Sequence, residues 1–123
     1  MEIFIYIGGT IITLWGVAHL IPTKGIVAGF GQLSKDNRLV ITMDWLAEGF
    51  TLIFIGILSL LVVSVAAPGD KIATTVYLAL AGMLVALAGL SLFTGFRTSV
   101  VPIKVCPFVK LTVALLFLLG IVT

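Results

Sequence analysis

The chain has 123 residues, of which 61% are hydrophobic and only 10% are charged, and its formal net charge is +2. Together with a mean hydropathy of +1.34, this composition excludes a soluble domain, in which about a quarter of the residues are charged. The basic residues are spread over loops and helix ends without a basic run, so the positive charge does not indicate nucleic-acid binding.

Four apolar segments predict an all-α integral membrane four-helix bundle, with one domain over residues 1–123. A membrane-spanning helix needs roughly 20 apolar residues, and we expect spans at about 3–21, 40–66, 70–96 and 103–121. The first span ends before Pro22, which a helix rarely passes. We expect it to be retained, because no small-residue cleavage site follows it. Pro68 and Gly69 end the second span, and Asp70 is a good N-cap for the third.

The first loop, residues 22–39, is too long for a tight turn. Its apolar residues Ile26, Val27, Phe30 and Leu33 repeat at helical spacing, which predicts a short helix on the membrane surface. Glycines at positions 25, 29 and 31 favour a packed loop equally well, so both alternatives stay open.

The distribution of basic residues predicts the orientation of the bundle. Most of them fall in or near the first and third loops: Lys24, Lys35, Arg38, Arg97, Lys104 and Lys110. The second loop has only Lys71. Because loops rich in Lys and Arg stay in the cytoplasm, we expect loops one and three to be cytoplasmic and both termini to lie on the outer side.

A cluster of polar residues is the strongest functional signal. Glu48 and Asp44 lie four residues apart on one face of the second span. A charge in hydrocarbon costs roughly 2.5–3.5 kcal/mol on insertion scales and marks a candidate functional site. At about 1.5 Å per residue, five ionisable groups from all four spans share the cytoplasmic half of the membrane: His19, Asp44, Glu48, Arg97 and Lys110.

Within this cluster we expect two ion pairs, Glu48 with Lys110 and Asp44 with Arg97. Two tryptophans accompany them, since Trp15 shares the helical face of His19 and Trp45 adjoins Asp44. The cluster has two interpretations: a structural layer of ion pairs, or a cytoplasm-facing cavity that holds a ligand or relays protons.

A metal centre is a weaker interpretation of the same residues. His19, Asp44 and Glu48 offer one imidazole and two carboxylates, but the chain has a single histidine and nearby cations oppose a metal. Cys106 has no second cysteine to resolve it, so we expect a structural or incidental role. We expect no metal, no cofactor and no catalytic residue.

Small residues form seams that let helices approach closely. The third span carries Ala79, Gly82, Ala86 and Gly89, while Gly9, Gly16, Gly49 and Gly56 recur on the first two spans. Close packing within one bundle is the simpler interpretation, and a homo-oligomer seam is the alternative.

The segment Gly16–Pro22 (GVAHLIP), followed by a charged loop and an acidic second span, resembles small four-span DoxX-like membrane proteins of bacteria and archaea. The resemblance implies a multi-pass protein of a prokaryotic plasma membrane. Some members are implied to be subunits of redox complexes. This chain lacks the cysteines or additional histidines that would carry electrons itself.

Our leading hypothesis is a non-enzymatic membrane protein that binds a partner or a small lipophilic ligand at the polar cluster. One alternative is an oligomeric transporter or proton-coupled carrier that uses Glu48, and another is a membrane enzyme or redox-complex subunit. Beyond the lipid bilayer, the expected partners are a second copy of the chain or a lipophilic ligand.

Overall fold

A computed structural model describes residues 2–123, which are helical apart from short connections. The elements are α1 (Glu2–Leu20), α2 (Thr23–Ala28), α3 (Lys35–Val65), α4 (Lys71–Phe93), the 3-10 turn η1 (Gly95–Arg97) and α5 (Val101–Val122). Helices α1, α3, α4 and α5 are long and apolar enough to cross a membrane. The prediction of an all-helical fold with four apolar spans is thus confirmed.

Capping residues set where α3 and α4 begin. The Asp70 carboxylate accepts the backbone N–H groups of Ile72 at 2.7 Å and Ala73 at 2.9 Å, as its predicted N-cap role requires. Helix α3 begins at Lys35, earlier than predicted, because the Ser34 hydroxyl accepts the backbone N–H of Asn37 at 3.1 Å. The first loop is correspondingly shorter, and its first half is the short helix α2.

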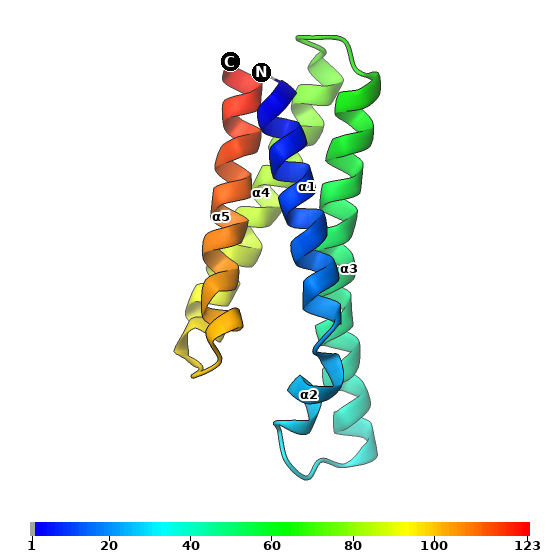
Figure 1. Cartoon of the computed structure of the whole chain (residues 1–123), viewed down its shortest axis with the longest axis vertical. Helices are drawn as coiled ribbons and strands as arrows, with labels where there is room; N and C mark the ends of the chain where they lie inside the picture. The colour runs from blue at the N-terminus through cyan, green and yellow to red at the C-terminus, as the bar shows by residue number, and fades with distance from the viewer. Residues whose placement is uncertain (1) are drawn as a thin grey trace.

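The four long helices form two hairpins, α1–α3 and α4–α5. Helix α1 packs against both α3 and α5, whereas α3 and α4 touch little although they are consecutive. Figure 1 shows the hairpins meeting where α1 begins and α5 ends, which we call the closed end. They diverge toward the opposite end, which carries α2 and η1 and which we call the open end.

Glycines bring α1 and α3 close together. Gly9, Gly16, Gly49 and Gly56 are all buried between the two helices. A Cβ atom on Gly56 would lie 2.7 Å from the Gly9 carbonyl oxygen and 2.9 Å from the Thr13 nitrogen, which leaves no room for a side chain. Close packing within the bundle is therefore confirmed for these two spans.

The small residues of α4 behave differently. Ala79, Gly82 and Ala86 are exposed, and a Cβ atom on Gly82 or Gly89 would meet open space. The expectation that this seam packs within the bundle is wrong, because α4 turns a different face toward the core, the one that carries Tyr77, Leu80 and Leu84.

Apolar side chains also cover the outward faces of the bundle. Leu14 on α1, Phe54 on α3 and Leu115 on α5 are each more than half exposed. Surface of this kind is unfavourable in water and suits contact with lipid tails. Together with the four apolar helices, it gives the chain the architecture of a multi-pass membrane protein.

Candidate functional site

A cavity of about 1100 Å³ lies between the two hairpins at the open end; we call it the wedge cavity. All four long helices contribute to its walls, which are mostly apolar. Its size matches the largest small-molecule pockets, which span roughly 300–1,000 Å³. Figure 1 shows the reason for the space, since α4–α5 leans away from α1–α3 at this end.

Glu48 and Lys110 join the hairpins across the wedge cavity. Lys110 on α5 is completely buried, and its ammonium donates to the Glu48 carboxylate on α3 and, at 2.8 Å, to the Ser91 hydroxyl on α4. The Glu48 side chain keeps 30% of its surface exposed and lines the cavity. The predicted Glu48–Lys110 pair is confirmed, and it is physically required because a buried ammonium needs a counter-charge.

His19 lies beside this pair at the end of α1. Its side chain is only 8% exposed, and its Nε2 lies 3.7 Å from Glu48 Oε2, beyond hydrogen-bond range. No group in residues 2–123 forms a hydrogen bond with Nε2. His19 also lines the wedge cavity, but this nitrogen is itself buried, a polar atom without a hydrogen-bond partner just behind the cavity wall.

Trp45 fixes the position of His19 in two ways. The two rings stack with their centroids 4.0 Å apart and their planes at 15°. The Trp45 indole N–H also donates to the His19 backbone carbonyl at 2.8 Å. That carbonyl is among the last four of α1, which lack a partner within the helix. The imidazole is thus held in one orientation by an adjacent helix.

Trp15 makes a second polar contact between the hairpins. Its indole N–H donates to the Cys106 thiol on α5 at 3.3 Å, and both side chains line the wedge cavity. The structural role expected for Cys106 thus corresponds to one contact, in which its sulfur accepts the hydrogen bond from Trp15. Trp15 and Trp45 together place two aromatic rings beside the polar cluster.

The predicted pair of Asp44 with Arg97 is wrong. Asp44 lines the wedge cavity but is exposed, and the described residues provide no ion-pair partner for it. Arg97 lies in η1, is exposed and does not line the cavity. The depth estimate placed both groups at one level of the membrane, but Asp44 belongs to the α1–α3 hairpin and Arg97 to the connection between α4 and α5.

Two hydrogen-bond acceptors in the site were not predicted from the sequence. Ser91 accepts the second hydrogen bond of Lys110, and Cys106 accepts that of Trp15. A search for hydroxyl groups at the depth of the buried lysine would have found Ser91. Cys106 could not be assigned in this way, because its contact depends on how the two hairpins cross.

The cluster does not assemble a metal site among residues 2–123. No three His, Cys, Asp or Glu side chains come together as ligands. His19 and Glu48 are neighbours, but the Lys110 ammonium already occupies one Glu48 oxygen. The arrangement can therefore bind polar groups through hydrogen bonds to an imidazole and a partly exposed carboxylate.

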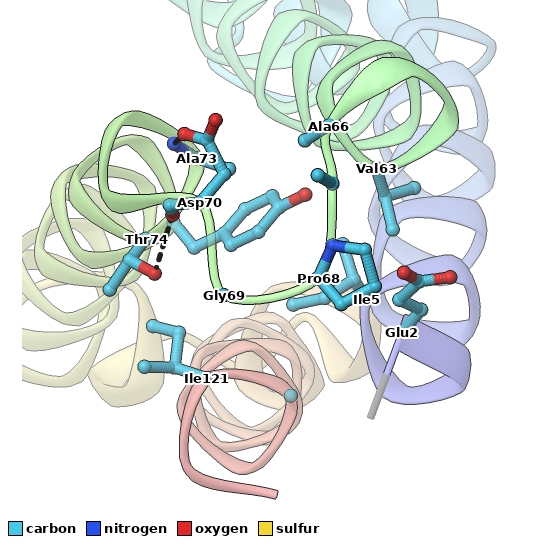
Figure 2. Close-up of a pocket in the computed structure, with 13 residues that line it drawn as sticks. Glu2, Ile5, Val63, Ala66, Pro68, Gly69, Asp70, Ala73, Thr74 and Ile121 are labelled. Atoms are coloured by element: carbon cyan, nitrogen blue, oxygen red, sulfur yellow. Dashed lines mark hydrogen bonds between the residues drawn. The ribbon is translucent and has the colours of Figure 1, made fainter.

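A second cavity lies at the closed end and is much smaller, about 80 Å³. Figure 2 shows it beneath the α3–α4 turn, with Glu2 and Asp70 on opposite sides of the opening. The backbone carbonyl of Asp70 accepts the Thr74 hydroxyl at 2.9 Å, and its carboxylate caps α4. A space of this size holds a few water molecules, so the wedge cavity remains the candidate site.

Comparison of the chain with protein-family models, with curated proteins and with solved structures gives no match in any of the three. The geometry of the wedge cavity therefore carries the argument for function.

Proposed function

We propose that this chain is a multi-pass membrane protein that binds a small lipophilic ligand non-covalently in the wedge cavity. One observation carries the proposal: a large, mostly apolar cavity whose wall includes the partly exposed carboxylate of Glu48 and the side chain of His19. Pockets that bind small molecules combine an apolar lining with a few placed polar groups in this way.

The orientation expected from the basic residues is part of the proposal. If loops one and three are cytoplasmic, the open end and its cavity face the cytoplasm of a prokaryotic cell. Alkaline phosphatase, which is active only outside the cytoplasm, should work when fused after Thr123 and fail when fused after Gly31. The reverse pattern would refute this orientation.

The two tryptophans of the chain provide a direct binding assay, because both line the wedge cavity. A brominated alkyl compound quenches indole fluorescence on contact. Titration of bromodecane into the protein in lipid nanodiscs should therefore quench the fluorescence in a saturable manner, beyond the linear quenching caused by partition into lipid.

A matched pair of variants distinguishes the cavity from the lipid-facing surface. Ala18 lines the wedge cavity and Ala79 lies on the outward face of α4. Saturable quenching should weaken in Ala18→Phe, where the added ring takes up part of the cavity, and persist unchanged in Ala79→Phe. Equal, unsaturable quenching in all three proteins would overturn the proposal.

A proton-coupled carrier is the second candidate, favoured by the Glu48 carboxylate that reaches the cavity while bonded to Lys110. Proteoliposomes loaded with a pH-sensitive dye would then show proton flux that Glu48→Gln removes. Absence of flux in the wild-type protein would exclude this candidate and leave the binding protein.

A further inference from the structure

We propose that the ligand of the wedge cavity is a lipophilic alcohol, whose single uncharged hydroxyl bridges His19 Nε2 and Glu48 Oε2. This inference rests on the proposed function and deepens it by naming the ligand's chemical class.

The first argument is the gap between the two atoms. At 3.7 Å they are too far apart for a direct hydrogen bond but close enough for one oxygen atom to bond to both. Nε2 itself is buried, so the oxygen enters only when a neighbouring side chain moves slightly aside, and residues 2–123 provide no hydrogen-bond partner for this nitrogen. An unpaired buried nitrogen is unfavourable, so a ligand that satisfies it gains affinity.

The second argument is the type of hydrogen bond that each atom can form. An ionised carboxylate only accepts hydrogen bonds, whereas a neutral imidazole nitrogen that bears a proton donates. Lys110 already donates to Glu48 Oε1, which leaves Oε2 as the free acceptor. When the imidazole carries its proton on Nε2, a hydroxyl can donate to Oε2 and accept from Nε2 at once. An ether or a ketone can only accept, so it cannot satisfy the carboxylate.

The third argument is charge. Lys110 is neutralised by Glu48, and the wall also contains the carboxylate of Asp44, which has no ion-pair partner among residues 2–123. An anionic head group would face two carboxylates without a free cation. A cationic head group would lie beside the fully buried Lys110 ammonium and compete with it for Glu48. An uncharged head group avoids both penalties.

The fourth argument is the rest of the cavity wall. It consists largely of aliphatic and aromatic side chains, among them Leu87, Leu90, Val105 and the two tryptophans. The wall also has four hydroxyl groups, each of which already donates to a backbone carbonyl three or four residues earlier: Thr51, Ser91, Thr94 and Thr98. The apolar groups suit an alkyl chain or a fused ring. The ligand class is therefore one hydroxyl on an apolar body.

A water molecule in the gap is the competing explanation, because water also donates and accepts. The two explanations differ in one measurable respect. A water-filled gap gives no preference among ligand head groups, whereas a hydroxyl-binding gap does.

The test measures tryptophan quenching in nanodiscs by five compounds that share a brominated decyl chain. They are bromodecanol, its methyl ether, bromodecane, bromodecanoate and bromodecyltrimethylammonium. After correction for partition into lipid, bromodecanol should bind about tenfold more tightly than its methyl ether, the factor that one hydrogen bond of about 1.4 kcal/mol gives.

The matched variant is His19→Phe, which keeps an aromatic ring against Trp45 but removes Nε2. It should bind bromodecane as the wild type does and lose the preference for bromodecanol. Asp44→Asn, which leaves the bridging atoms intact, should retain that preference. If His19→Phe fails to fold, the wild-type comparison of bromodecanol with its ether decides alone.

The outcomes separate this inference from the proposed function. Saturable binding of all five compounds with equal affinity, or tightest binding of a charged one, would overturn the hydroxyl site and leave the ligand-binding function standing. An alcohol preference that survives in His19→Phe would also overturn it. Absence of saturable quenching by every compound would overturn both.

Discussion

At the scale of single residues, Lys110 dominates the energetics of the site. It is the largest fully buried side chain of the described residues, and its charge is balanced by Glu48. Burial is unequal within the pair, because Glu48 keeps 30% of its side chain exposed to the cavity. The loss of stability should therefore depend on which of the two charges is removed.

Removing the charge of Glu48 should lower the free energy of unfolding more than removing the charge of Lys110. Glu48→Gln leaves a fully buried ammonium without a counter-charge, which should cost about 3 kcal/mol, the lower end of measured losses for broken buried pairs. Lys110→Met should cost less, because the remaining carboxylate is hydrated from the cavity. The free energy of unfolding in mixed micelles measures both.

The double variant Glu48→Gln/Lys110→Met tests whether the two effects are coupled. It should lose less stability than the sum of the single variants, because no isolated charge remains. Asp44→Asn serves as the control and should stay within about 0.5 kcal/mol of wild type, as exposed substitutions do. Strict additivity of the two single losses would contradict a stabilising pair.

The contrast between the two predicted ion pairs shows how far a sequence can define such a site. Hydropathy and helical rise place Glu48 and Lys110 at one depth, and a fully buried lysine must find a counter-charge, so this pair follows from elementary physics. The same depth argument fails for Asp44 and Arg97. Both reach solvent-accessible positions, where no desolvation penalty forces them together.

At the scale of elements, glycines in similar sequence patterns have opposite environments on two helices. Gly56 on α3 is buried against the α1 backbone, whereas Gly82 on α4 faces open space. Both belong to small-residue seams in the sequence, and the pattern alone could not distinguish them. Which face of α4 is buried depends on tertiary packing. The wedge cavity depends on it as well, because a hydropathy profile contains no information about the angle between the hairpins.

Alanine at these two glycines should therefore have opposite effects. Gly56→Ala places a methyl group within 3.0 Å of α1 backbone atoms that cannot rotate away, so it should destabilise the protein by about 1–3 kcal/mol, as overpacking does. Gly82→Ala should be neutral or stabilising by up to about 1 kcal/mol, the helix-propensity gain over glycine. Thermal unfolding in the same detergent compares them.

Equal destabilisation by both substitutions would mean that Gly82 is also packed, which points to a second copy of the chain against α4. Chemical cross-linking of wild type and Gly82→Ala in membranes would then identify that contact directly.

The start of α4 gives a second prediction at this scale. The Asp70 carboxylate satisfies two of the four backbone N–H groups that a helix leaves free at its N-terminus. Asp70→Ala should lower the free energy of unfolding by about 1 kcal/mol. Asp36→Ala is the comparison, because Ser34 rather than Asp36 caps α3. A smaller loss for Asp70→Ala than for Asp36→Ala would contradict the capping role.

At the scale of the whole molecule, the structure is two hairpins with a shared apolar core at the closed end and a cavity between them at the open end. Phe117, Ile5 and Leu84, from three different helices, are fully or almost fully buried in that core. Toward the open end, Glu48–Lys110 and Trp15–Cys106 are polar contacts that connect one hairpin to the other. These two contacts therefore help to set the width of the wedge cavity, in addition to the apolar packing between the hairpins.

The reactivity of Cys106 measures the width of the wedge cavity, because Cys106 is the single cysteine of the chain and lies in the cavity wall, where it is only 6% exposed. Its reaction with N-ethylmaleimide should be slow in the wild type. In Glu48→Gln/Lys110→Met it should be several-fold faster, since the loss of one connection lets the hairpins separate without leaving an isolated charge. Gly82→Ala, which changes only the outward face of α4, should react at the wild-type rate. Equal rates in the double variant and the wild type would show that apolar packing alone holds the open end together. In that case the ion pair would contribute to stability without setting the width of the cavity.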